Sequence, residues 1–153
     1  EEQLRIFDAL KQQTIQILDE PMEWQQAIHK ASEPLLHRAI IKKSYVQAMI
    51  DLLYDYGPYI VLANGVAIAH ANPEQGANAL GLSLLINKQS ITFEDDANVH
   101  FLFVLSNPDQ DKHLHLLRDI MRLANDTALV DQLLKMEDTL AILEGLKKLS
   151  NMQ

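Results

Sequence analysis

The sequence contains no cysteine among its 153 residues. Disulfide bonds, zinc sites built on thiolates and a cysteine nucleophile are therefore excluded. The absence also fits a reducing cytoplasm, which is where we expect the protein to work. Nearly half of the residues are hydrophobic, so the chain can build a full core, and residues 1–153 suit one domain better than two.

Basic residues and long apolar runs are also scarce. Lysine and arginine supply 13 residues against 21 aspartates and glutamates, which gives a formal net charge of −8. Nucleic-acid binders need a basic face, so this balance argues against nucleic acid and leaves a basic protein partner open. No apolar run approaches the length of a membrane-spanning helix, and we expect no such span.

Several catalytic motifs are missing as well. The sequence has no phosphate-binding loop of nucleotide hydrolases, no glycine-rich dinucleotide fingerprint, no H-E-x-x-H zinc motif and no G-x-S-x-G nucleophile turn. His113 and His115 stand two residues apart, so on a helix they point in different directions and do not form a metal pair. The residues therefore indicate no metal site.

One stretch, Tyr59–Ala71, organises the rest of the chain. It is expected to form an apolar strand, a tight turn at Asn64-Gly65 and a second short strand that ends at His70. A histidine at a strand end, followed by a loop, is rigidly supported and yet open to a partner. Spacing alone favours a structural alternative, in which the imidazole only caps the strand and bonds the loop.

The chain before this stretch is expected to be mostly helical. Apolar spacing predicts a helix over residues 1–11 and an edge strand over residues 14–18. A second helix is expected from residue 19 onward, and a third over residues 45–56. Pro34 should bend or break the third of these elements near Ser32. Ser44 is expected to cap the last helix, and Gly57 to end it.

The chain after the stretch alternates between strands and helices. Two nearly continuous apolar runs, residues 80–86 and 99–105, predict strands buried on both faces, with a turn at 88–90 between them. Three helices should follow, the first starting at residue 112 with Asp111 as its cap. The last, over residues 139–149, should turn three leucines inward: Leu140, Leu143 and Leu146. This interleaved order predicts a three-layer α/β domain, a mixed sheet with helices on both faces.

Two histidines remain at the ends of elements: His70 after a strand and His113 in the first turn of a helix. Backbone N–H groups at a helix start favour an anion. If the order of strands brings that helix start beside His70, the two imidazoles and the N–H groups would surround a phosphoryl group.

At this point four ordered segments carry a resemblance. Gly57–Glu74 resembles the active-site segment of enzyme IIA domains of the bacterial sugar phosphotransferase system, in the mannitol/fructose superfamily and closest to its ascorbate-type branch. Leu80–Leu85 and Asn107–Leu114 are similar to a strand and a helix start of that family. Residues 24–28 and 33–36 are similar to its first helix.

The resemblance implies a role for each histidine. His70 would accept a phosphoryl group from the histidine phosphocarrier protein and pass it to a cognate IIB domain, and the membrane IIC component would be reached only indirectly. His113 would hold the phosphoryl oxygens. No cofactor is implied, because the donor arrives phosphorylated. Ala69 replaces a usual proline, and Leu52 stands where mannitol-type members carry an arginine.

Two functions follow from this resemblance. The first is a phosphotransferase component of sugar uptake that forms a phosphohistidine, with an ascorbate-like system favoured. The second is a IIA-like regulatory domain cut from a transcriptional regulator that senses phosphorylation.

Overall fold

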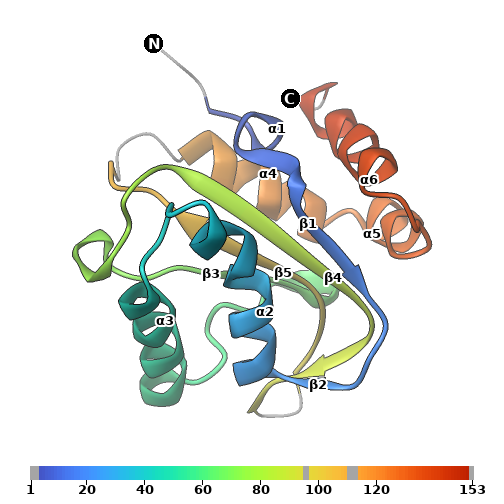
Figure 1. Cartoon of the computed structure of the whole chain (residues 1–153). Coiled ribbons are helices and arrows are strands. Elements are labelled where there is room, and N and C mark those ends of the chain that lie inside the picture. The colour runs from blue at the N-terminus through green and yellow to red at the C-terminus, as the bar shows by residue number, and fades with distance from the viewer. Residues whose placement is uncertain (1–3, 95–96, 110–113, 152–153) are drawn as a thin grey trace.

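A mixed β-sheet forms the middle layer of the protein (Figure 1). The computed structural model describes residues 4–94, 97–109 and 114–151. The strand order is β1-β4-β5-β3, and a short β2 pairs with the end of β4. The strands are β1 (Leu10–Leu18), β2 (Met22–Glu23), β3 (Val66–Ala69), β4 (Gly81–Thr92) and β5 (Asn98–Ser106). Among the described helices, none is long and apolar enough to cross a membrane.

The strand directions gather particular chain ends at one edge of the sheet. β3 runs parallel to β5, β5 runs antiparallel to β4, and β4 runs parallel to β1. The carboxyl ends of β3 and β5 therefore lie at the same edge as the amino ends of β4 and β1. Whatever follows β3 directly, beginning with His70, stands at this edge, which we call the carboxyl edge.

Helices cover both faces of the sheet, as the sequence predicts (Figure 1). One face carries α2 (Trp24–His37) and α3 (Lys43–Tyr56). The other carries α1 (Ile6–Ala9), α4 (Leu114–Ala124), α5 (Thr127–Leu134) and α6 (Thr139–Leu146). Short 3₁₀ turns lie at Ala63–Gly65, Pro73–Gln75 and Lys147–Asn151.

Side chains that alternate along the strands build the two cores. On β5, Phe101, Phe103 and Leu105 enter the α4 side, while Leu102 and Val104 enter the α2–α3 side. A strand covered on both faces has no side that faces water, so nearly all of its side chains are apolar. This explains the nearly continuous apolar runs of β4 and β5. Both predicted strands are confirmed, and so is the edge strand β1, which starts four residues earlier than expected.

Pro34 does not break its helix, so the break near Ser32, one of the two outcomes that the sequence predicted, is wrong. α2 continues through it to His37. Proline removes the N–H that would bond the carbonyl of Lys30, four residues earlier. That carbonyl accepts instead from the Gln16 Nε2 amide of β1, at 2.6 Å. A distant side chain thus supplies the missing donor.

The predicted helix start at residue 19 is also wrong. The chain forms β2 first, because Met22 and Glu23 pair with Ile91 and Thr92, and α2 begins only at Trp24. The predicted turn at residues 88–90 is also absent. β4 continues through these residues, and its pairing with β5 is irregular there, between Ile86 and Ile91.

Of the helix predicted over residues 1–11, only Ile6–Ala9 is helical, and Leu10 already starts β1. The other predicted helices are confirmed with shifted ends. Gly57 ends α3 with φ 76°, and its N–H donates to the Leu53 carbonyl. Ser44 does not cap α3, since its hydroxyl donates to the Gln75 carbonyl at 2.6 Å. In α6, Leu146 is buried and Leu143 half-buried, but Leu140 is 49% exposed. Asp111, the expected cap of α4, lies outside the described residues.

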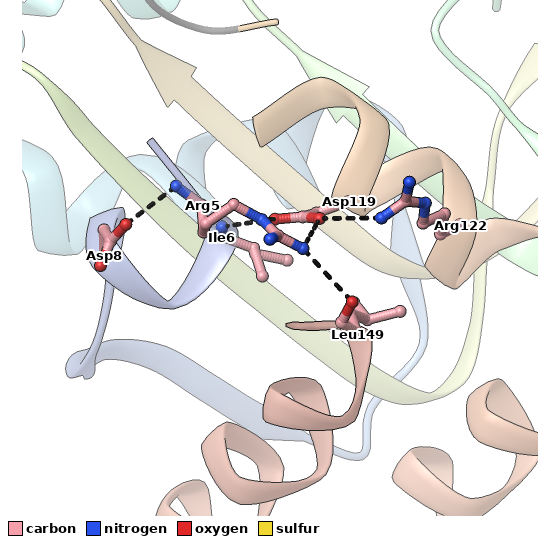
Figure 2. Close-up of polar contacts among 6 residues, drawn as sticks. All are labelled: Arg5, Ile6, Asp8, Asp119, Arg122 and Leu149. Atoms are coloured by element: carbon pink, nitrogen blue, oxygen red, sulfur yellow. Dashed lines mark hydrogen bonds and ion pairs between the residues drawn. The ribbon is translucent and has the colours of Figure 1, made fainter. Parts of the chain in front are cut away.

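An ion-pair cluster ties α1 to α4 and to the C-terminal turn (Figure 2). Asp119 of α4 is almost fully buried and accepts two hydrogen bonds from the Arg5 guanidinium, at 2.8 and 2.7 Å, and one from the Ile6 N–H at 2.9 Å. Arg5 also donates to the Leu149 carbonyl, at 3.3 Å. The hydrogen bond to Asp119 raises the pKa of Arg5. This cluster fixes the position of α4 on the sheet.

Candidate functional site

His70 is the first residue after β3. The four residues of β3 are all buried, and His70 is exposed. Of its neighbours, Ala69 and Ala71 are buried on the α2–α3 side of the sheet. By alternation the imidazole belongs to the opposite, α4 side. The sequence predicted this position, an exposed histidine at the end of a rigid strand.

The expected hairpin before His70 forms only in part: the turn is present, but its first strand is not. Asn64 and Gly65 have the predicted positive φ, 57° and 74°. Tyr59–Ala63, however, forms no regular strand: only a single bridge joins Val61 to Ala67. β3 pairs instead with β5, over four residues from Val66 opposite Phe101 to Ala69 opposite Val104.

The end of β5 lies beside His70. β5 stops at Ser106, and the next residue, Asn107, accepts a hydrogen bond from the Asp109 N–H at 3.1 Å. This short turn leads the chain away from the sheet on its way to α4. Ser106 is held in place by a bond from its hydroxyl to the Ala79 carbonyl, at 2.7 Å, next to the start of β4.

The direction of α4 places its start at the carboxyl edge. At its far end, the Ala124 carbonyl accepts from the Asn64 Nδ2 amide at 2.7 Å, and Asn64 lies before the amino end of β3. α4 has 11 residues and so spans about 16 Å. α4 therefore runs in the direction opposite to β3, and its start lies at the edge where His70 stands.

His113, the second predicted site residue, lies outside the described residues. Leu114, the residue after it, begins α4 and is 56% exposed. The described part of the chain thus places His70 and the segment next to His113 at one edge and on one face of the sheet.

Tyr45 of α3 anchors the backbone just after His70. Its hydroxyl accepts from the Ala71 N–H at 3.0 Å and donates to the Leu105 carbonyl at 2.7 Å. Tyr45 is only 1% exposed. Burial raises the pKa of its hydroxyl, and the hydrogen bond from Ala71 partly opposes that rise. The sequence interpretation missed this residue, although its spacing of four from Met49 indicates the buried face of the helix.

The loop after His70 is held by short-range bonds. Asn72 accepts from the Glu74 N–H at 3.0 Å and caps the 3₁₀ turn Pro73–Gln75. Gly76 follows with φ 136° and packs against Ser44 and Lys42 at the start of α3. The loop is therefore attached to α3 on one side and to β3 on the other.

An open groove of about 530 Å³ lies between this loop and α3. Ala71, Asn72 and Gln75 line one wall, and the outer face of α3 lines the other. That wall includes Leu52. Two carboxylates also line the groove, from Asp51 and Asp55.

Three described histidines, His29, His37 and His100, do not join this site. His29 and His37, interpreted from the sequence as structural or solvated, are exposed on α2. His100 lies on β5 with Nδ1 2.9 Å from the Asn87 carbonyl. Within the described ranges, no three histidines or carboxylates come together in a way that could hold a metal ion.

Comparisons with known proteins agree on one family. Residues 8–149 match the family model "Phosphoenolpyruvate-dependent sugar phosphotransferase system, EIIA 2". The mannitol-specific cryptic phosphotransferase enzyme IIA component of Escherichia coli is 33% identical over 132 residues, which cover 86% of this chain and 90% of that protein. The ascorbate-specific EIIA component of Salmonella choleraesuis is 30% identical over 134 residues, 85% and 87% of the two chains.

Solved structures show the same fold. The solution structure of the cryptic mannitol enzyme IIA from Escherichia coli has a TM-score of 0.83 at 30% identity, covering 95% of this chain and 99% of that one. The complex of the mannitol enzyme IIA with phosphorylated IIB, also from Escherichia coli, contains a chain with a TM-score of 0.76 at 18% identity, with 91% and 99% coverage.

Proposed function

The chain belongs to the EIIA type-2 family of the phosphoenolpyruvate-dependent sugar phosphotransferase system, and on that premise we propose that it is a phosphocarrier. His70 accepts a phosphoryl group from the histidine phosphocarrier protein and gives it to a cognate IIB domain. The observation that carries this proposal is the position of His70: exposed, directly after a fully buried strand, at the edge where β5 ends and α4 begins. We propose that residues 1–153 form one such domain, working in the cytoplasm.

The chemistry needs an oriented, neutral imidazole. A ring nitrogen of His70 attacks the phosphorus of the donor's phosphohistidine, the new N–P bond forms, and the old N–P bond breaks with its electron pair returning to the donor imidazole. Rigid support of His70 by β3 lowers the cost of reaching this geometry. No cofactor enters, because the phosphoryl group arrives on the donor.

His113 is proposed to stabilise the transferred group. It precedes Leu114, the first residue of α4, and α4 starts at the edge that holds His70. An imidazole N–H and the free N–H groups of a helix start would donate to the phosphoryl oxygens, which carry the most charge in the transition state.

The groove beside the loop supports brief docking of a IIB partner. It opens next to Ala71 and Asn72, the two residues that follow His70, and its volume of about 530 Å³ leaves room for side chains of a partner. A complex with phosphorylated IIB is known for a related fold. Leu52, in place of an arginine, favours a IIB of the ascorbate type over one of the mannitol type.

The direct test is phosphorylation in a reconstituted system. With phosphoenolpyruvate, enzyme I and the histidine phosphocarrier protein, the wild-type chain should acquire an acid-labile, base-stable phosphoryl group. His70→Ala should abolish it, while His29→Ala and His37→Ala, which change exposed histidines of α2, should label normally. Normal labelling of His70→Ala would show that the acceptor has been misassigned.

The partner is tested by following transfer of the labelled phosphoryl group from His70 to IIB domains. Phosphorylated protein is mixed with purified IIB domains of the ascorbate and mannitol types, and loss of label from His70 is followed. Rapid loss to the ascorbate-type domain is expected. If no IIB drains the label, while the activity of a regulator fused to the chain follows its phosphorylation, the regulatory alternative replaces the carrier.

The role of His113 is tested in the same assay. His113→Ala should slow labelling or onward transfer by about 10²-fold, the usual effect of losing a preorganised donor. His115→Ala is the matched control, since it changes a histidine two residues away. Equal effects of the two substitutions would contradict the proposed role.

A further inference from the structure

The Tyr45 hydroxyl occupies an unusual place in the sheet. The paired register of β3 and β5 ends with Ala69 opposite Val104. Beyond that point the hydroxyl links the two chains, because it accepts from the Ala71 N–H at 3.0 Å and donates to the Leu105 carbonyl at 2.7 Å. One side-chain oxygen thus stands between an amide and a carbonyl that would otherwise face each other across the sheet.

This link holds the backbone on the carboxyl side of His70. β3 fixes the chain up to Ala69 through its ladder with β5, and Tyr45 fixes it again at Ala71. The residue between these two attachments is His70. Its φ and ψ are therefore restrained from both sides, although its side chain is exposed.

The partners of Tyr45 have no easy substitute. Ala71 is 7% exposed and Leu105 is 4% exposed, so water has little access to either residue. If the hydroxyl were removed, a buried amide and a buried carbonyl would be left without their partner, and the chain would shift to satisfy them. The residue that can move with least loss of packing is the exposed one between the anchors.

We propose that Tyr45 is a positioning residue for His70: its hydroxyl, by bridging Ala71 and Leu105, holds the imidazole in the direction needed for phosphoryl transfer. The proposal rests on the function assigned to His70 above. Tyr45 does not touch the phosphoryl group and acts only through the backbone.

The expected kinetic effect is one of orientation. Tyr45→Phe keeps the ring and its packing and removes only the bridge. A misplacement of the nucleophile by about 1 Å can cost about 10²-fold in rate. Tyr45→Phe should therefore lower the maximal rate of His70 phosphorylation by about 10- to 100-fold, while the KM for the phosphorylated histidine carrier stays unchanged, because the docking surface is intact.

A matched control removes a buried hydroxyl elsewhere. Ser32 of α2 is fully buried and donates to the Ile28 carbonyl at 2.7 Å. Ser32→Ala loses a buried hydrogen bond without touching the His70 segment, so it should transfer at the wild-type rate. A merely structural role for Tyr45 would make the two variants alike, with rates that follow their stabilities.

Amide hydrogen exchange tests the anchor without using activity. The Ala71 N–H should exchange slowly in the wild type and much faster in Tyr45→Phe, and the ring resonances of His70 should shift in the variant only. Fast exchange of Ala71 in the wild type would overturn the proposal, even if Tyr45→Phe did not fold. So would a Tyr45→Phe protein that transfers phosphoryl groups at the wild-type rate.

These measurements separate the two levels of inference. If the wild type is never labelled on His70, the proposed function fails, and the exchange and resonance data still decide whether Tyr45 fixes the His70 backbone. If the wild type is labelled and Tyr45→Phe shows faster Ala71 exchange with an unchanged maximal rate, the carrier function stands and the positioning role of Tyr45 is refuted.

Discussion

Arg5 and Asp119 form a two-pronged ion pair, with hydrogen bonds of 2.8 and 2.7 Å, although 114 residues separate them in the chain (Figure 2). The pair joins the segment before α1 to the middle of α4. Because α4 begins next to His113 and at the edge where His70 lies, the same pair that holds the N-terminal segment also sets where the start of α4 lies.

The first prediction concerns the stability of this pair. Asp119→Ala should lower the free energy of unfolding by about 3–5 kcal/mol, because it leaves the Arg5 guanidinium and the Ile6 N–H without their buried acceptor. Urea denaturation measures the loss. Arg122→Met is the control: its guanidinium lies 4.0 Å from the same carboxylate and is partly exposed, so it should cost less than about 1 kcal/mol. Equal losses for both variants would contradict the dominance of Arg5.

The second prediction concerns alkaline pH. Burial raises the pKa of Tyr45 above its ordinary value of 10.0, so the folded state holds this proton more tightly than the unfolded state. Its contribution to stability is therefore complete below about pH 10 and is lost as the pH rises through the folded pKa. Unfolding in urea, measured from about pH 8 to 11, should show a steeper alkaline decline for the wild type than for Tyr45→Phe. Parallel curves would contradict it.

The third prediction concerns the loop after His70. Gly76 has φ 136°, and an added Cβ would lie 2.9 Å from the Ser44 hydroxyl oxygen and 3.0 Å from the Lys42 Cβ. Gly76→Ala should cost about 1–3 kcal/mol of unfolding free energy, through backbone strain and overlap together. Gly57→Ala provides the control, since φ is 76° there and the space is open, with about 1 kcal/mol expected. A smaller loss at Gly76 than at Gly57 would be inconsistent with the close packing of the loop on α3.

The fourth prediction couples Gln16 to Pro34. In the wild type, Gln16→Ala removes the donor to the Lys30 carbonyl and should cost about 1 kcal/mol. Pro34→Ala restores a helical N–H that can reach the same carbonyl, so Gln16→Ala should cost much less in that background. A double-mutant cycle in urea measures the difference. Gln26→Ala, on the exposed side of α2, should show no coupling, and additive costs for Gln16 and Pro34 would refute the explanation.

Family resemblance and local pattern together predicted much of the site. His70 was placed at a strand end from the apolar run before it, and the Asn64-Gly65 turn from its residue types. The identity of Tyr45 as an anchor was missed, because its two partners lie 26 and 60 residues away in the chain. Helical spacing can indicate that a tyrosine is buried, but it does not reveal which backbone atoms its hydroxyl will meet.

The sequence by itself determined the features that depend on residues close together in the chain. Gly57 ends α3, Asn64 and Gly65 adopt positive φ, and the apolar runs of β4 and β5 become strands buried on both faces, since each follows from local sterics or from periodicity. The tertiary structure alone decided features in which a distant group supplies a missing partner. Pro34 stays helical because Gln16 donates to the Lys30 carbonyl, and β3 pairs with a strand that lies about 35 residues later in the chain, β5. His70 is likewise fixed from both sides only where α3 brings Tyr45 to the end of β5, since a hydrogen bond is satisfied by any donor that the fold delivers, however far away it lies in the chain.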